Sequence, residues 1–278
     1  MVTKVLVLGG TGMLGSAVVQ YLQGLPGLDI WSTYRSSSEA IAEKVAPRNV
    51  DWMPFDARED DITELPLDEA DYTINCIGII KPYVMDRPLS TIHVNVEFPH
   101  LLAAISTRLI HITTDCVFSG NLLYPETYTE DSVHDALDVY GKSKSLGEPE
   151  DAMVLRTSII GQEIHKFASL ISWAQSQKGK KVNGFTNHYW NGITTRQYAE
   201  VCFKIIQEQL FEPGVFHVHS PDFVNKYQLL TLLDAKFDLH MDIRPVEAPS
   251  AVNRLLSSKK GLCAKLELPS IEEQIRRL

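Results

Sequence analysis

The sequence predicts an α/β fold with a doubly wound parallel sheet and a smaller, mainly helical lobe. Short apolar runs alternate with helical patterns over the first 160 residues, which is typical of βαβ units joined into a parallel sheet. A glycine-rich turn follows the first apolar run, at the place where such sheets bind a dinucleotide. Beyond residue 160 the alternation weakens, so we expect the smaller lobe to begin there.

Seven runs rich in leucine, β-branched or aromatic residues are predicted strands. Helical patterns, of which "GMLGSAVVQYL" at 12–22 is the first, fall between most of them. The polar, glycine-rich and aromatic stretch 177–192 is predicted to be loop, and the tail from residue 221 to be mostly helical. The predicted strands are 4–8, 29–34, 50–55, 72–79, 108–114, 152–158 and 215–219.

These patterns predict two domains. Residues 1–160 are expected to form the dinucleotide-binding domain, completed by about 190–220. Segments 161–189 and 221–278 are expected to form a substrate-binding lobe that closes over the ends of the sheet.

Composition narrows the class of protein. The 278 residues are 44% hydrophobic and 22% charged, with a net charge of −9 and no long basic run, which argues against nucleic acid as the main partner. The four cysteines form no C-x-x-C pair, as expected for reduced thiols in a cytoplasmic protein. No signal peptide is recognised, and no apolar run approaches the roughly 20 residues that span a bilayer.

The glycine turn lies in "LVLGGTGMLGSAVV", between a predicted strand and a predicted helix. Gly10-x-Gly12-x-x-Gly15 fits the Rossmann dinucleotide fingerprint, and Gly9-x-x-Gly12-x-x-Gly15 fits a variant spacing. Gly12 would let the backbone approach a pyrophosphate at the helix N-terminus, and Gly15 would let helix and strand pack closely. The alternative is a tight turn that binds no ligand.

Arg35 decides between the two nicotinamide cofactors. An NAD site expects an acidic residue at the end of the second strand, roughly 20 residues past the glycines. Here "STYRSSS" offers Arg35 beside Ser36–Ser38, and arginine matches a 2′-phosphate. The sequence therefore predicts NADP(H), unless Arg35 is a solvated surface residue.

Three residues suit reduction of a ketone. Tyr140 and Lys144 in "VYGKSK" share one face of a predicted helix, and Thr114 closes the fifth predicted strand. A free tyrosine has a pKa near 10, which a neighbouring ammonium would lower. We expect Thr114 to orient a carbonyl oxygen, Tyr140 to protonate it and Lys144 to bind the cofactor ribose. Alternatively, Tyr140 and Lys144 are the polar face of a surface helix.

The motifs together resemble the extended short-chain dehydrogenase/reductase family. They are the glycine loop, "TTDCVFSG", "YGKSKSLGE", "LRTSIIG" and the helix "NVEFPHLLA". The sequence is most similar to the dTDP-4-dehydrorhamnose reductase-like branch of nucleotide-sugar enzymes, specifically over residues 1–161 and more loosely beyond. The resemblance implies reduction of the 4-keto group of a nucleotide-linked 4-keto-6-deoxy sugar, in deoxysugar biosynthesis. Relatives are often dimers, so it also implies a homodimer.

The resemblance implies site residues as well. Thr114, Tyr140 and Lys144 would be the catalytic triad, Asp56 would contact adenine, and the residues from Cys76 to Gly78 would line the cofactor. The expected cofactor-binding residues are Gly9, Thr11, Gly12, Met13, Leu14, Gly15, Arg35, Asp56, Cys76, Ile77, Gly78, Tyr140 and Lys144.

Two positions bear on which sugar chemistry occurs. Related dehydratases carry Glu two residues after the catalytic threonine, where this chain has Cys116 after Asp115, so dehydration is disfavoured. GDP-fucose synthase, an epimerase and reductase, is similar at this position. If this chain resembles it in activity too, Cys116 and His165 would form the epimerase pair. Some relatives of this branch are instead regulatory subunits that bind NADP(H) without turnover.

The remaining candidates are substrate contacts and metal ligands. Lys81, Trp190 and Arg254 would join Thr114, Asp115 and Cys116 around the substrate, although each of the first three has a core or surface alternative. Trp190 would stack a sugar or base and Arg254 would bind a diphosphate. No metal is expected, because Ser16 replaces an acidic residue of the reductases. His217 and His219 share one face of a strand without a third ligand.

Overall fold

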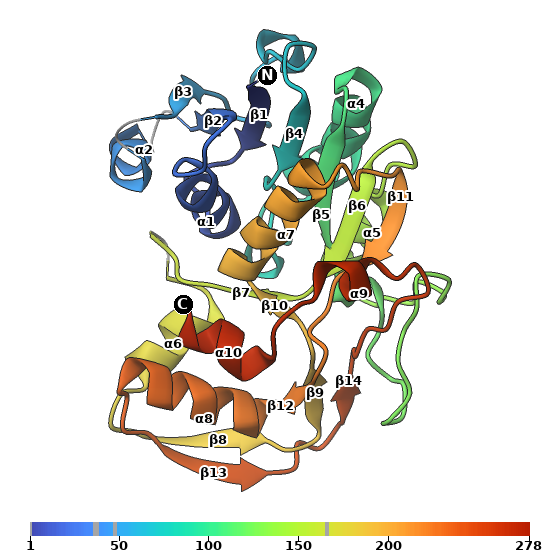
Figure 1. Ribbon diagram of the computed structural model, residues 1–278. Helices are drawn as coiled ribbons and strands as arrows, with labels where there is room; N and C mark the ends of the chain where they lie inside the picture. Colours follow the sequence, from blue (N-terminus) through green and yellow to red (C-terminus); the bar gives the residue numbers. More distant parts are fainter. Residues whose placement is uncertain (1, 36–38, 47–48, 165–166) are drawn as a thin grey trace.

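The large lobe is built on a seven-stranded sheet in the order β11-β6-β5-β4-β1-β2-β3 (Figure 1). All six neighbouring pairs run parallel, so the prediction of a doubly wound α/β fold is confirmed. This computed structural model describes residues 2–35, 39–46, 49–164 and 167–278. Within those ranges no helix is both long and apolar enough to cross a membrane.

All seven predicted strands form. The strand β4 ends at Asn75 rather than near residue 79, because the Asn75 side chain accepts a hydrogen bond from the Ile77 backbone N–H (2.9 Å) and turns the chain out of the sheet. The strands are β1 Thr3–Leu8, β2 Leu28–Tyr34, β3 Asp51–Pro54, β4 Tyr72–Asn75, β5 Leu109–Thr114, β6 Met153–Thr157 and β11 Gly214–His217.

Helices cover both faces of the sheet. The α-helices of this lobe are α1 Met13–Leu22, α2 Glu39–Val45, α3 Pro88–Ile92, α4 Phe98–Ile105, α5 Val139–Leu146 and α7 Thr195–Gln207. A π-helical turn, η4 His93–Glu97, joins α3 to α4. Short 3₁₀ turns are η2 Ile62–Glu64, η3 Lys81–Tyr83 and η5 Asp115–Val117.

The side chains of β1 alternate between two cores. Val5 and Val7 pack with residues of α1 and α7, whereas Leu6 and Leu8 pack with Phe98 of α4 on the other face. All four side chains are fully buried. A strand buried on both faces reads as a continuous apolar run, which is why "KVLVL" is recognisable in the sequence.

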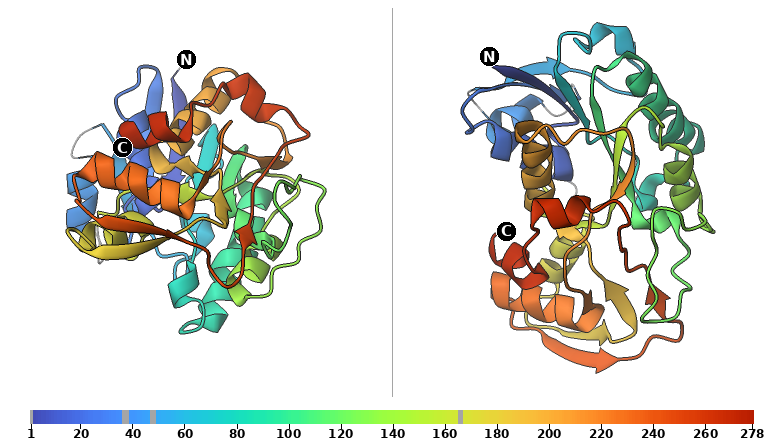
Figure 2. Two further views of the ribbon diagram at one scale, coloured as in Figure 1. Left: turned by 90° about the horizontal axis from the view of Figure 1, so that it is seen from below. Right: turned by 45° about the vertical axis from the view of Figure 1, so that its right-hand side comes forward.

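The small lobe lies below the sheet and has its own core (Figure 2). Its strands are β8 Lys181–Phe185, β9 His188–Trp190, β12 Val224–Asn225, β13 Asp242–Val246 and β14 Val252–Asn253. Its helices are α6 Leu170–Ser176, α8 Lys226–Phe237, α9 Leu262–Leu266 and α10 Ile271–Arg276, of which α9 packs on the large-lobe core. A short parallel pair, β7 Ile159–Ile160 with β10 Ile193–Thr194, runs between the lobes.

One prediction about this lobe is wrong: the stretch 177–192 contains β8 and β9 instead of loop. The tail has most of its regular structure in helices, as expected, but it also contains β12, β13 and β14. Strand β8 pairs in parallel with β13, with Lys181 opposite Asp242. The pairing partner therefore lies far along the chain, and nothing local in the sequence announces it.

The helix α7 and the strand β11 belong with the large lobe in space. The helix packs against α1, and the strand pairs with β6. On these contacts we propose the domain boundaries expected from the sequence: 1–160 with about 190–220, and 161–189 with 221–278.

Candidate active site

A cleft of about 840 Å³ lies at the carboxyl ends of the parallel strands. Ligands of open α/β sheets bind at this edge, because the strand order reverses there. Most of the predicted site residues line it: Gly9, Thr11, Gly12, Met13, Leu14, Arg35, Asp56, Cys76, Ile77, Gly78, Lys81, Thr114, Asp115, Cys116, Tyr140 and Lys144. Gly15, Trp190 and Arg254 do not line the cleft.

The glycine turn packs as its spacing predicts. Gly9 has φ +80°, and a Cβ on Gly15 would lie 2.2 Å from the Gly9 carbonyl oxygen, so only glycine lets α1 approach β1 this closely. Gly12 is the N-cap of α1 and no side chain caps the helix. The first N–H groups of the helix are therefore available to an anion in the cleft. These features fit the pyrophosphate of a dinucleotide.

Two arginines, Arg35 and Arg58, line the cleft beyond the ends of β2 and β3. Arg58 donates to the Asp56 carboxylate through its Nε (2.8 Å), its backbone N–H (3.1 Å) and its Nη2. These hydrogen bonds hold the pKa of Asp56 below its usual range. Arg35 lies close enough to lower that pKa further. The sequence prediction named Arg35 and Asp56 but missed Arg58, whose only local signal is its place after the third strand. Ser36–Ser38 lie outside the described residues.

The helix α5 brings Tyr140 against Thr114. The Asp138 side chain caps the helix by accepting from the Gly141 N–H (2.8 Å). A Cβ on Gly141 would lie 2.2 Å from the Cys116 carbonyl oxygen. The absence of a side chain at Gly141 therefore lets α5 pack directly on the turn that follows β5, and Tyr140 and Thr114 share a hydrogen bond.

Lys144 is held one turn further along α5. Its ammonium donates to the Ile112 carbonyl oxygen (2.9 Å), and the residue is 5% exposed. Burial lowers the pKa of Lys144 to about 8. A buried, tethered ammonium at the cleft wall is placed to bind a ligand hydroxyl without rearranging.

Tyr140 departs from the sequence prediction. Burial raises its pKa, with the neighbouring Cys116 acting in the same direction and the hydrogen bond with Thr114 opposing them. The expected lowering of the pKa of Tyr140 by Lys144 is therefore wrong, because desolvation of the phenolate dominates. A phenol with a raised pKa keeps its proton at neutral pH, which suits a proton donor.

Asp115 and Cys116 line the cleft directly after Thr114. The Thr114 hydroxyl donates to Asp115 Oδ1 and accepts from the Cys116 N–H, both at 3.2 Å. Burial raises the pKa of Asp115 and raises that of Cys116 to about 12. His165, the other half of the expected epimerase pair, lies outside the described residues.

The three other predicted substrate contacts are differently placed. Lys81 reaches the cleft and pairs with Asp138 (2.6 Å). The Arg254 guanidinium donates to the carbonyl oxygens of Phe118 and Ser119, both at 2.8 Å. Trp190 is 8% exposed and packs in the core of the small lobe, so the structure does not bring it to the cleft.

Buried polar residues support the site from behind. The Asn95 side chain bonds both the N–H (2.8 Å) and the carbonyl oxygen (2.9 Å) of Ile79, which fixes the loop after β4. Arg156, 1% exposed, pairs with Glu148 and donates to the ring of His217 (2.8 Å). Neither role has a local sequence signal, because no recognisable motif links either residue to its partners.

The two histidines, His217 and His219, do not lie on the same strand. His217 ends β11, and His219 lies beyond the strand. Among the described residues no group of three His, Cys, Asp or Glu side chains is arranged to hold a metal ion. The Ser16 hydroxyl donates to the Met13 carbonyl oxygen.

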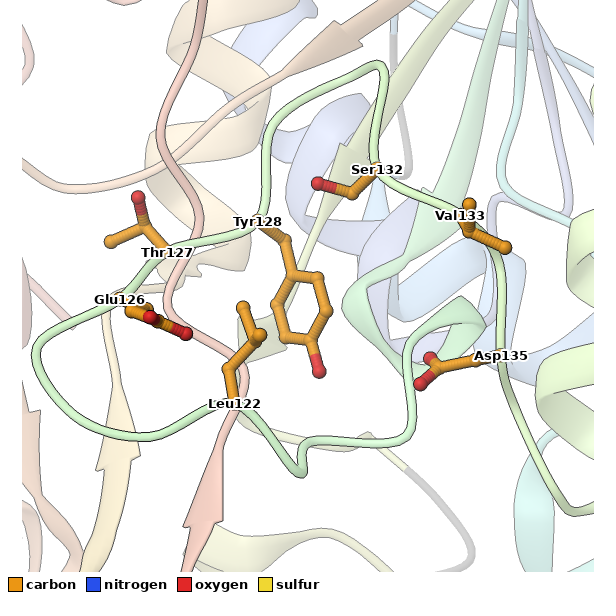
Figure 3. Close-up of a pocket in the computed structure, with 7 residues that line it drawn as sticks. All are labelled: Leu122, Glu126, Thr127, Tyr128, Ser132, Val133 and Asp135. Atoms are coloured by element: carbon orange, nitrogen blue, oxygen red, sulfur yellow. The ribbon is translucent and has the colours of Figure 1, made fainter.

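A separate hollow of about 530 Å³ lies along the loop before α5. Figure 3 shows Leu122 and Tyr128 side by side near its centre, with Glu126 and Asp135 on either side. It shares no lining residue with the cleft.

Comparison with known proteins places the chain in a family. A sequence model described as the RmlD substrate-binding domain matches residues 3–260. The chain belongs to this family. The match confirms the resemblance to the dTDP-4-dehydrorhamnose reductase-like branch that the motifs indicate.

Relatives and solved structures agree with this assignment. Methionine adenosyltransferase 2 subunit beta of Mus musculus is 25% identical over 291 residues, covering 98% of this chain and 84% of that protein. The spore coat polysaccharide biosynthesis protein SpsK of Bacillus subtilis is 27% identical over 158 residues, or 54% of this chain and 53% of that protein. The structure of dTDP-4-dehydrorhamnose reductase from Bacillus anthracis with NADP superposes with a TM-score of 0.72 at 19% identity, covering 100% and 98% of the two chains.

Proposed function

We propose that this protein is an NADPH-dependent reductase of the 4-keto group of a nucleotide-linked 4-keto-6-deoxy sugar, acting in deoxysugar biosynthesis. The observation that carries the proposal is the convergence of Thr114, Tyr140 and Lys144 on one cleft that begins at the glycine turn. The solved reductase of Bacillus anthracis, which has the same fold and binds NADP, supports it.

The residues present fit NADP(H). The uncapped start of α1 would hold the pyrophosphate, and Arg35, with Arg58 beside it, would hold the 2′-phosphate. When bound, the cofactor supplies the hydride. Lys144 would bind the ribose, and Thr114 would orient the substrate carbonyl. Tyr140 would donate its phenolic proton to the oxygen that becomes the alcohol, and its raised pKa keeps that proton in place until transfer.

The test is NADPH oxidation with a panel of dTDP-, UDP-, GDP- and CDP-linked 4-keto-6-deoxy sugars, with NMR of the products. Tyr140→Phe should lower turnover by about 10²- to 10⁴-fold while NADPH binding is retained, because only the proton donor is lost. Tyr124→Phe, at a 48% exposed tyrosine that lines neither hollow, is the matched control. Unchanged turnover in Tyr140→Phe would exclude its role as the donor.

A binding subunit without turnover is the second candidate. It is favoured by the relative named methionine adenosyltransferase 2 subunit beta, which aligns with 98% of this chain. In this case the chain would bind NADP(H) and a partner protein. Tight NADPH binding without oxidation by any sugar of the panel would support it over the reductase.

The bifunctional epimerase and reductase is less well supported. A base at Cys116 would have to be a thiolate, and burial raises the pKa of this thiol to about 12. Reduction in deuterated water separates the two reactions. Deuterium at C3 or C5 of the product would show epimerisation, and its absence would show reduction alone.

A further inference from the structure

Glu148 and Arg156 form an ion pair that is closed off from solvent. Their side chains are 6% and 1% exposed, and Arg156 Nη2 donates to Glu148 Oε2 at 2.6 Å. Arg156 Nε also donates to Glu148 Oε1 at 3.1 Å. Thr113, which is 2% exposed and lines the cleft, donates its hydroxyl to the same Oε1 at 2.6 Å. The Glu148 carboxylate is therefore joined to the wall of the cleft through one threonine.

Glu148 connects the two elements that carry the candidate catalytic residues. Thr113 precedes Thr114 at the end of β5 and lies opposite Arg156 in the pairing of β5 with β6. Glu148 follows the C-cap of α5, the helix that carries Tyr140. The hydrogen bonds that Glu148 accepts from Thr113 and Arg156 therefore fix the C-terminal end of α5 against the ends of both strands.

A second chain of hydrogen bonds holds α5 to Arg156. Arg156 Nη2 donates to His134 Nε2 at 2.8 Å, and His134 Nδ1 lies 2.6 Å from the Ser145 hydroxyl oxygen. Because arginine has only donors, His134 Nε2 must accept, which leaves Nδ1 of the neutral ring to donate to Ser145. Ser145 lies on α5 next to Lys144. Two chains of contacts thus run from one arginine to the helix.

The contribution of this buried ion pair lies in its geometry more than in stability. The desolvation of two buried charges offsets most of their attraction, and well-packed apolar residues of similar volume are often as stable. Carboxylate oxygens and guanidinium N–H groups, however, bond only in a narrow range of directions. Through Thr113, that fixed direction reaches the strand end that carries Thr114. A displacement of about 1 Å between reacting groups can lower a rate about 10²-fold.

We propose that Glu148 is a positioning residue for the reduction. Held by Arg156, it fixes Thr113 and with it the end of β5. The Thr114 hydroxyl on β5 and the Tyr140 phenol on α5 thereby keep the spacing that proton transfer requires. Glu148 itself does not line the cleft, so it acts through Thr113 and α5. This inference rests on the proposed function, since it assumes a reaction at Thr114 and Tyr140.

Steady-state kinetics test the proposal, with NADPH and whichever 4-keto-6-deoxy sugar of the panel wild type reduces fastest. Thr113→Val removes the hydroxyl that reaches Glu148, while the ion pair and the side-chain shape remain. It should lower kcat about tenfold and leave KM for NADPH within about twofold. Thr113→Ser, which keeps the hydroxyl, should have a kcat within about twofold of wild type.

Thr73→Val is the matched control. Thr73 lies on β4 beside β5, is 1% exposed and does not line the cleft. Its hydroxyl makes no hydrogen bond with a described residue. This variant should keep the wild-type kcat and KM, so that a loss in Thr113→Val cannot come from replacing just any buried threonine.

A double-mutant cycle with Glu148→Gln separates positioning from direct contact with a ligand. Glutamine keeps the size of the side chain but removes the charge that pairs with Arg156. If Thr113 acts through Glu148, the loss of kcat in the double variant should be clearly smaller than the product of the two single losses. Losses that multiply would overturn the proposal, because the Thr113 hydroxyl would then act independently of Glu148.

Two further results would overturn it. One is an unchanged kcat in Thr113→Val. The other is an equal loss of kcat in Thr113→Ser, because packing rather than the hydroxyl would then set the rate. Failure of the proposed function differs from all of these, since wild type itself would oxidise NADPH with no sugar of the panel, and the role of Glu148 would fall with it.

Discussion

The two lobes differ in how far along the chain their pairing partners lie. In the large lobe, β1, β2 and β3 are adjacent in the sheet and consecutive in the sequence, and so are β4, β5 and β6. In the small lobe, β8 pairs with β13 and β9 pairs with β12 and β14, with helices and other strands between. The sheet of the large lobe can therefore be predicted from local patterns. The strand pairs of the small lobe form only when segments far apart in the chain come together. The stability of the small lobe should depend on a few long-range core contacts, which mutations can test.

Trp190→Ala should have the largest effect on stability. Trp190 is 8% exposed in the small-lobe core, and such a truncation costs about 3–5 kcal/mol. Because the small lobe has a hydrophobic core of its own, we expect it to unfold first and NADP(H) binding to survive. Denaturant unfolding followed by tryptophan fluorescence and by cofactor binding checks this.

The control for Trp190 is Trp173→Ala in α6 of the same lobe. Trp173 is 43% exposed, and surface substitutions usually change stability by no more than about 0.5 kcal/mol. If Trp190→Ala loses NADP(H) binding at the same denaturant concentration as small-lobe structure, the two lobes fold as one unit. That result would contradict the difference drawn here between the lobes.

His217 should make the stability of the protein sensitive to acid, because it lies where the large lobe meets the tail. It is fully buried, accepts from Arg156 of β6 and bonds the carbonyl oxygen of Ser257 in the tail (2.8 Å). Burial and then Arg156 lower its pKa from 6.5 to about 4. As pH falls below 6.5 the unfolded chain binds this proton first, so the stability contributed by neutral His217 is present above pH 6.5 and lost towards pH 4.

The measurement for His217 is the free energy of unfolding between pH 7 and pH 4. In His217→Gln the slope should be shallower by about 1.4 kcal/mol per pH unit, the value for one proton. His240→Asn, at an exposed histidine of the small lobe, should keep the wild-type slope. An unchanged slope in His217→Gln would show that protonation of His217 does not cause the loss of stability in acid.

Gly15→Ala should have a smaller effect, confined to the large lobe. The new Cβ would lie 2.2 Å from the Gly9 carbonyl oxygen, so α1 must shift from β1, at a cost of about 1–3 kcal/mol. NADP(H) affinity should fall because the N-terminus of α1 moves, while the small lobe keeps its stability. Gly24→Ala, where a Cβ meets nothing within 4 Å, should leave affinity and stability unchanged.

The candidate site was predictable where local motifs place residues on one edge of the sheet. Thr114 ends a strand, and Tyr140 and Lys144 share a helix face, so all three reach the cleft. Trp190 could not be placed from its type alone, because a tryptophan suits a core as well as a sugar site. Arg58, which lines the cleft, was missed because it belongs to no recognisable motif.

The sequence by itself determined the sheet, the glycine turn, the order of the motifs and hence the family. These features depend on side-chain periodicity and on residue types at fixed short spacings. Only the tertiary structure decided that Trp190 is core, that Arg254 binds backbone carbonyls and that burial raises the pKa of Tyr140. Burial and charge at those positions are set by segments far apart in the chain, and the contacts between such segments leave no local pattern.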